Sequence, residues 1–319
     1  MNKTLRSHKL LLYLFFLNII FGVSAKAQTA ADAIMIPKNS FCGGLMFSHS
    51  SWDNYWEGTF KRDNGNIGTL STNTFVAMAN YGISSKLNVL VSLPYLRTNA
   101  SAGTLDGQHG LQDVSVALKW VPLTINTGYG KVRLFAVAAG SVPVTNYQAD
   151  FMPMSIGLHC NSLMFRALAD YQNGHLFFTG SGEFMRRDNI SIDRTAYYTT
   201  EMHYTNQVSI PNGTGFAFRG GFRSSKLIAE AVLENTTTLG GFDIRKNDMP
   251  FPSNRMNATS AGINFKYSFT GVPAIRGLEL TAGSNFVVAG RNVGQSTMIH
   301  GGAYYLFNLN KKHAGKSSI

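Results

Sequence analysis

The alternation that decides the fold runs through Val114-Ser115-Val116-Ala117-Leu118-Lys119-Trp120. It recurs in Ala261-Gly262-Ile263-Asn264-Phe265-Lys266-Tyr267-Ser268-Phe269, where every second residue is apolar. Successive side chains of a strand point to opposite faces, so such segments have one apolar and one polar face. About a dozen stretches of this kind follow one another after residue 40, which predicts an all-β chain.

The predicted strands are joined by connections that alternate between short and long. The strands are expected at 41–50, 70–81, 86–96, 112–121, 131–141, 162–171, 175–186, 214–223, 226–235, 258–269, 277–289 and 297–307. The short links are 82–85, 122–130, 173–174, 224–225 and 270–276, and the longer ones are 51–69, 97–111, 142–161, 187–213, 236–257 and 290–296. Bacterial outer-membrane barrels have an even strand number, short periplasmic turns and longer external loops. The sequence therefore predicts a transmembrane antiparallel up-and-down β-barrel of about twelve strands, with both termini periplasmic.

The N-terminus has the features of a signal peptide. A basic start and an apolar run over 10–23 precede Ala25-Lys26-Ala27, an A-x-A cleavage site. The run is shorter than the ~20 residues that span a bilayer as a helix. We expect cleavage after Ala27, a periplasmic segment 28–40 that is a candidate plug, a barrel over 41–307, and a flexible tail over 308–319.

The chain carries a net charge of +11, which falls to +7 when the four basic residues of the signal peptide leave. The sequence has no basic cluster with interleaved aromatic residues, which is the pattern that indicates nucleic-acid binding. In an exported barrel the charge favours contacts with outer-membrane lipids and lipopolysaccharide. The other expected partners are a small-molecule solute and the barrel-assembly machinery, and the sequence leaves the oligomeric state open.

The two cysteines, Cys42 and Cys160, belong to an exported chain and so could pair. The predicted topology places them at opposite rims, about 25 Å apart. A disulfide needs Cα atoms about 5.5 Å apart. We expect two free thiols.

If the apolar face of each strand points toward lipid, charged side chains of both signs face the lumen. Those expected to line a solute path are Asp113, Lys119, Arg133, Arg166, Asp170, Glu183, Arg219, Glu230 and Lys266; Arg223, Glu234 and Glu279 also face inward. A ring of one sign would indicate ion selectivity, whereas a balanced set favours pairing across strands. These charges either brace the wall and fill the interior or contact a solute.

Turn positions predict which of these charges meet. A two-residue turn at Ser224-Ser225 would place Arg219 directly opposite Glu230. Asn-Gly is a strong hairpin signal, and a two-residue turn at Asn173-Gly174 predicts further cross-strand partners. These are Asp170 opposite Phe177, Arg166 opposite Ser181, and Glu183 diagonal to Arg166.

Two neighbouring stretches carry a family resemblance. They are Asn80-Tyr81-Gly82-Ile83-Ser84-Ser85-Lys86-Leu87-Asn88-Val89-Leu90-Val91-Ser92-Leu93-Pro94-Tyr95 and Gly110-Leu111-Gln112-Asp113-Val114-Ser115-Val116-Ala117-Leu118-Lys119-Trp120. They resemble the outer-membrane family labelled for the MetA-pathway of phenol degradation, with its YG turn, its LPY end, and a G-x-G-D segment that runs to K-[YW]. Gln112 stands where that family usually has its second glycine, whereas Asp113 and Lys119 match.

The resemblance implies a 12-stranded outer-membrane barrel distantly similar to hydrocarbon and fatty-acid channels. The phenol label is a weak guide to the substrate. Apart from the resemblance, Asp113 and Lys119 lie six residues apart on one strand face, which suggests anchors for partners on neighbouring strands.

The combined prediction is an outer-membrane channel or transporter for passive uptake or efflux of small solutes, hydrophobic ones among them. The long connections 97–111, 187–213 and 236–257 would control entry. The alternative is a closed structural or assembly barrel that binds a partner through its loops. An outer-membrane hydrolase is less favoured, because His159, His175 and His300 lie in no catalytic order with serine. We expect no catalytic residue, no metal site and no cofactor.

Overall fold

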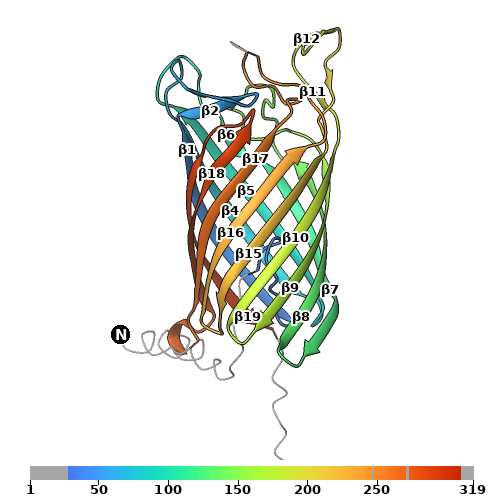
Figure 1. Ribbon diagram of the computed structural model, residues 1–319, viewed down its shortest axis with the longest axis vertical. Coiled ribbons are helices and arrows are strands. Elements are labelled where there is room, and N and C mark those ends of the chain that lie inside the picture. The colour runs from blue at the N-terminus through green and yellow to red at the C-terminus, as the bar shows by residue number, and fades with distance from the viewer. Residues whose placement is uncertain (1–27, 246–247, 271–272, 310–319) are drawn as a thin grey trace, which may run out of the picture.

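The computed structural model describes residues 28–245, 248–270 and 273–309. The predicted signal peptide and residues 310–319 of the predicted tail lie outside them. Twelve long strands of the described chain form one cylinder (Figure 1). They are β1 (Ser40–Trp52), β4 (Leu70–Gly82), β5 (Leu87–Ala100), β7 (Asp113–Thr127), β8 (Gly130–Pro143), β9 (Ser162–Asn173), β10 (Leu176–Arg187), β15 (Gly213–Arg223), β16 (Leu227–Thr238), β17 (Asn257–Ser268), β18 (Leu278–Arg291) and β19 (Thr297–Asn308).

Each long strand pairs antiparallel with the long strands before and after it in the chain, and β1 pairs with β19 to close the cylinder. The predicted antiparallel up-and-down barrel and its number of strands are confirmed. A 3-10 turn, η1 (Pro273–Ile275), lies between β17 and β18. No helix of the described chain is long and apolar enough to cross a membrane.

The alternation of β7 shows why this sequence folds as a wall between lipid and water. The side chains of Leu118 and Trp120 point outward and are 48% and 51% exposed. Lys119 and Val121, which alternate with them, are buried. The same outward set recurs on other strands as Leu45, Phe75, Phe165, Phe178, Phe216 and Ile263. An apolar outer band of this kind is what a bilayer solvates.

The two ends of the cylinder differ as predicted. The turns β4–β5, β7–β8, β9–β10, β15–β16 and β17–β18 lie at one end, at the bottom of Figure 1, and the longer connections lie at the other. We call these the short-turn end and the long-loop end. The long connections carry short strands of their own: β2 (Asn54–Glu57), β3 (Phe60–Asp63), β6 (His109–Leu111), β11 (Ile190–Ser191), β12 (Tyr197–Tyr198), β13 (Met202–His203) and β14 (Gln207–Val208).

One predicted link is wrong. Residues 122–130 were expected to be a connection, but β7 continues to Thr127 and β8 begins at Gly130. The register shifts between Trp120 and Leu123, after which the ladder resumes. This bulge lets the hairpin extend beyond its neighbours, because an extra residue on one strand is absorbed without ending the pairing.

Both predicted hairpin registers are wrong by two residues. At β9–β10 the turn is Gly174-His175, since Asn173 pairs with Leu176 and Gly174 takes the positive φ of 55°. At β15–β16, Arg223 pairs with Ile228 instead of Lys226. The corrected partners are Asp170 opposite Thr179, Arg166 opposite Glu183, Arg219 opposite Val232 and Glu230 opposite Gly221. A two-residue slip preserves the faces, because the side-chain period is two.

The cysteines lie as expected. Cys42 is the third residue of β1, and Cys160 precedes β9 in a long connection. Both are buried and free. The prediction of two free thiols is confirmed.

Candidate functional site: the lumen and its N-terminal segment

Residues 28–39 enter the barrel lumen before β1 begins; we call them the N-terminal segment. It turns at Ala30-Ala31 and returns toward Ser40. Asp32 organises this turn, accepting hydrogen bonds from the backbone N and the hydroxyl of Thr29 at 2.7 and 2.9 Å and from the backbone N of Ile34 at 3.0 Å. A carboxylate that satisfies nearby backbone N–H groups fixes a tight turn locally.

Lys119 of β7 attaches this turn to the wall. Its side chain is fully buried, and Nζ donates to the carbonyl of Thr29 at 2.8 Å, to the Asp32 carboxylate at 2.9 Å and to the Asp32 carbonyl. An ammonium group has three N–H donors, so the segment uses all of them. The sequence led us to expect partners on neighbouring strands; Lys119 instead holds a segment that lies 87 residues away.

The charge of Asp32 is stabilised by this arrangement. Burial alone would raise the pKa of the Asp32 carboxyl, but the positive charges of Lys119 and Lys266 outweigh it and hold the pKa at about 2. Opposite charges nearby favour the ionised form. The turn therefore carries a carboxylate at neutral pH.

A second charged cluster lies beside the first. Asp170 of β9 is 1% exposed and accepts hydrogen bonds from Arg133 at 2.7 Å, from Arg223 at 3.0 Å and from the Thr179 hydroxyl at 2.7 Å. Arg133 also donates to the carbonyl of Ala33 at 3.0 Å. The buried carboxylate thus orients a guanidinium that holds the N-terminal segment.

Apolar side chains of the segment pack against three parts of the wall. Ala33 belongs to a cluster with Leu90, Ala117, Val121, Phe135, Val137 and Leu168. Ile34 packs with Phe177 and Ile228, and Ile36 with Cys42, Tyr304 and Leu306. The segment therefore contacts β5, β7, β8, β9, β10, β16, β1 and β19, and it fills much of the short-turn end.

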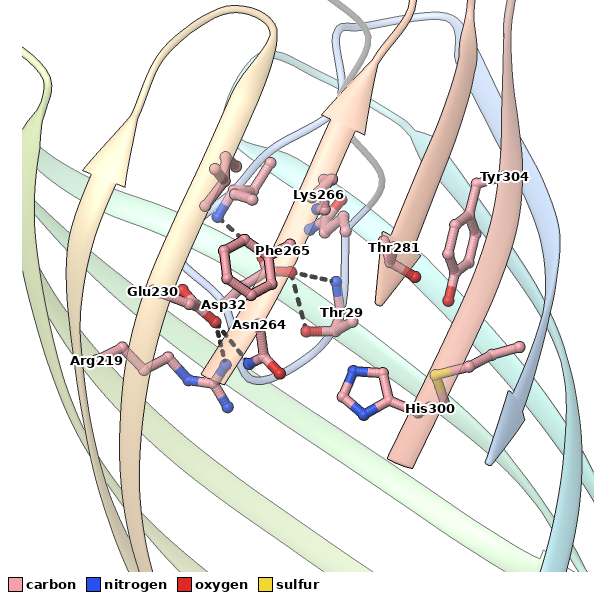
Figure 2. Close-up of a pocket in the computed structure, with 14 residues that line it drawn as sticks. Thr29, Asp32, Arg219, Glu230, Asn264, Phe265, Lys266, Thr281, His300 and Tyr304 are labelled. Atoms are coloured by element: carbon pink, nitrogen blue, oxygen red, sulfur yellow. Dashed lines mark hydrogen bonds and ion pairs between the residues drawn. The ribbon is translucent and has the colours of Figure 1, made fainter. Parts of the chain in front are cut away.

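Two cavities remain beside the segment. The first, of about 120 Å³, lies near the short-turn end between the segment and β1 with β15–β19 (Figure 2). The second, of about 310 Å³, lies nearer the long-loop end between Ala31 and β9, β10, β15 and β16. We call them the short-turn cavity and the long-loop cavity. Arg219 lines both, so its guanidinium lies where they adjoin.

Carboxylates fix the position of Arg219. Glu230 accepts from it at 2.9 Å and Glu234 at 2.5 Å, and Asn264 donates to Glu230 at 2.9 Å. Figure 2 shows Arg219, Glu230 and Asn264 together on one side of the short-turn cavity, with Thr281, His300 and Tyr304 on the other. The predicted pairing of Arg219 with Glu230 exists, but as a diagonal contact.

The other predicted residues are distributed along the lumen. Arg166 and Glu183 form an ion pair that lines the long-loop cavity. Lys266 lines the short-turn cavity near Asp32. Asp113 lies near the long-loop end, where it accepts a hydrogen bond from Tyr147 at 2.6 Å in the connection after β8. Its partner, like that of Lys119, is not on a neighbouring strand.

Sequence reasoning missed several lumen residues. Asp32, the organiser of the turn, was not singled out, and neither were Asn264, Thr281 and Tyr304. A signal for Asp32 was present, since Thr29 and Asp32 have the spacing of a locally capped turn. Among the described residues, no group of three or more His, Cys, Asp or Glu side chains has the geometry to hold a metal ion.

Comparison with solved structures bears on the fold. The COG4313 outer membrane channel from Pseudomonas putida F1 matches with a TM-score of 0.70 and 15% identity over 88% of this chain and 100% of that one. The two chains share the outer-membrane β-barrel fold. The NanC porin, at a TM-score of 0.43, 8% identity and coverages of 82% and 98%, is a more distant likeness.

A TodX monoaromatic hydrocarbon channel variant matches with a TM-score of 0.44 and 8% identity over 86% of this chain and 91% of that one. This score, like that of NanC, is too low to support an argument beyond general barrel shape. The sequence matches no protein-family model and no curated protein. The barrel fold and its apolar outer wall place the protein in the outer membrane.

Proposed function

We propose that the protein is a passive outer-membrane channel for small solutes, narrowed by the N-terminal segment. Solutes would pass from the long-loop cavity to the short-turn cavity beside the guanidinium of Arg219. In this proposal the short-turn end and both termini face the periplasm. Loops 97–111, 187–213 and 236–257 would control entry from outside.

The observation that carries the proposal is the off-centre position of the segment. Its hydrogen bonds go to Lys119 and Arg133 on one side of the lumen, whereas both cavities border β15 and β16 on the other. The short-turn cavity, at about 120 Å³, is smaller than the long-loop cavity, at about 310 Å³, so we expect only small molecules to pass.

The lining favours solutes with a polar group and an apolar body. Ile34, Met46 and Ile228 share the short-turn cavity with Arg219 and Lys266. The P. putida neighbour is described as an outer membrane channel, and we extend only the channel role to this chain.

The second candidate is a closed barrel that acts as a structural component. The buried network around Asp170 and the apolar clusters around Ala33 favour it, because they fix the segment in one position. Lipids, lipopolysaccharide and the assembly machinery remain predicted partners under either proposal.

Single-channel recording in planar bilayers tests the two candidates. If the protein is a channel, we expect reproducible steps of conductance. Their size should change severalfold in Arg219→Ala, because this change removes the side chain that borders both cavities. Arg62→Ala is the matched control, since Arg62 pairs with Glu57 in the long-loop hairpin β2–β3, outside the lumen. A folded, heat-modifiable barrel without steps supports the closed component, and lipid or peptide turnover lost on substitution of one histidine supports an enzyme.

A further inference from the structure

Gln28, the residue after the predicted cleavage site, is held inside the barrel. It is 1% exposed. Asn80 Nδ2 donates to its backbone carbonyl at 2.7 Å, and the side-chain amide of Asn88 lies 2.6 Å from its Oε1. Both asparagines are themselves buried, at 1% and 0% exposure. The first residue of the mature chain would therefore occupy a built polar site in the wall.

The charged groups around Gln28 already have partners, since Lys119 pairs with Asp32 and Arg133 with Asp170. Lys119 donates to the carbonyl of the next residue, Thr29, and Arg133 donates to that of Ala33. Lys266 lines the same cavity as Gln28. Cleavage after Ala27 would create an α-ammonium group here, and burying another cation in such a place is unfavourable.

We propose that the N-terminal Gln28 of the mature protein is cyclised to pyroglutamate, and that this neutral lactam is the group which Asn80 and Asn88 hold. The α-amine nitrogen attacks Cδ of the Gln28 side chain and forms the ring C–N bond. The Cδ–Nε2 bond breaks, a proton passes from the attacking nitrogen to Nε2, and ammonia leaves. The step needs no oxidant and no co-reactant.

The contacts of Gln28 fit the lactam. Cyclisation keeps the backbone carbonyl of Gln28, to which Asn80 donates. It removes Nε2, whose hydrogen-bond acceptor is the Met35 sulfur at 3.8 Å, a weak acceptor. Oδ1 of Asn80 is buried and accepts no hydrogen bond; the ring N–H is the uncharged donor that we assign to it. This inference does not depend on solute transport.

Amine labelling followed by mass spectrometry tests the proposal. The full chain is produced in a Gram-negative host, purified from outer membranes, denatured, and treated at once with an amine-specific reagent before proteolysis. We expect the peptide that begins at residue 28 to be one ammonia lighter than free glutamine and unlabelled at its α-nitrogen. A labelled Gln28 amine, or a mature chain that begins elsewhere, overturns the proposal.

Spontaneous cyclisation during preparation is measured in the same sample. An isotope-labelled synthetic peptide of residues 28–38 is added at lysis, and its cyclised fraction gives the background. A cyclised fraction of the protein no greater than that of the peptide overturns the proposal.

The variant Gln28→Ala separates burial from cyclisation, because alanine cannot form the ring. Its amine should label fully in denaturant but at least about tenfold more slowly in the folded barrel, where labelling requires local opening of the segment. The exposed amine of Lys86 at the short-turn end is the internal control and should label at similar rates in both states. Equal rates at residue 28 in the two states would show that the terminus is not held in the wall, which overturns the proposed site.

Discussion

The two sides of the lumen use their charged groups differently. On the β7–β9 side, Lys119 and Arg133 point their donors at backbone carbonyls of the N-terminal segment. On the β15–β19 side, Arg219 is bound by carboxylates of its own wall and borders open space. A charged side chain that binds the N-terminal segment fixes the position of that segment. A charged side chain that pairs with carboxylates of its own wall leaves the lumen beside it unfilled. The charged side chains of the lumen thus hold the N-terminal segment on one side and border a cavity on the other.

The largest effect is expected on the support side, from Asp170→Ala. This change leaves Arg133 and Arg223 without their buried carboxylate. Breaking a buried pair by removing one partner lowers the free energy of unfolding by about 3–5 kcal/mol. Urea unfolding followed by the gel shift of the heat-modifiable barrel measures it.

Asp243→Ala is the matched control for that variant. Asp243 pairs with Arg291 at the long-loop end, and its side chain is 40% exposed. An exposed pair contributes about 1 kcal/mol or less. Equal losses for the two variants would show that the lumen network does not support the barrel.

A smaller, local effect is expected for Lys119→Met, which removes the donors that hold the turn at Asp32. Loss of hydrogen bonding to a charged group costs about 1.5–3 kcal/mol. This loss falls on the N-terminal segment and not on the pairing of the strands, so the segment should be released while the barrel persists. Cys42, which packs with Ile36, is a built-in probe, because its thiol becomes accessible when the segment leaves. Thiol labelling resolved by mass spectrometry gives the rate at this position.

Cys160 serves as the reference thiol in the same molecule, since it is buried among loop residues far from the segment. Lys86→Met, at an exposed position, is the control substitution. Faster labelling of Cys42 alone is the expected result in Lys119→Met. Unchanged protection of Cys42 would show that apolar packing holds the segment without Lys119.

Acid should weaken the same attachment by about 2 kcal/mol. The pKa of Asp32 is held at about 2, below its usual 3.8, so the stabilisation is complete above pH 3.8 and is lost as the pH falls through about 2. Hydrogen exchange of residues 28–39, corrected for intrinsic rates, should accelerate over this range. In Asp32→Asn that change should be absent; an identical pH profile in the variant would assign it to another group.

The smallest effect is expected for Ile34→Val, which trims the contact with Phe177 and Ile228. Loss of one buried methyl group of this kind costs about 0.5–1.5 kcal/mol. Hydrogen exchange of the segment should increase modestly, without a change in unfolding of the barrel. Ile299→Val on the lipid-facing surface is the control, and an equal effect there would argue against specific packing of Ile34.

The barrel itself could be predicted because its pattern is local. All twelve strands, the parity of the connections and the inward face of residues such as Arg166 and Glu183 follow from the period of two. Turn chemistry was less decisive, because Gly174-His175 and Ser225-Lys226 form turns where the neighbouring Asn173-Gly174 and Ser224-Ser225 were expected. These two-residue errors in register changed the cross-strand partner of each residue but not the face of the barrel on which its side chain lies.

The interior arrangement could not be predicted from local pattern. Lys119 and Asp32 are separated by 87 residues, and Arg133 and Ala33 by 100. Nothing in the alternation of β7 indicates that the partner of Lys119 precedes the first strand. Such contacts are set by the closed cylinder, which places the residues before β1 beside strands far along the chain.

The shifted hairpins also bear on how this chain tolerates change in its length. Inserting or deleting two residues in a strand changes its cross-strand partners but leaves each side chain on the same face of the wall. A single-residue insertion in β7 before Leu118 would invert the residues that follow it, turning Lys119 toward hydrocarbon and Leu118 toward water. Variation in this wall should therefore occur in even steps, with odd ones confined to bulges and loops.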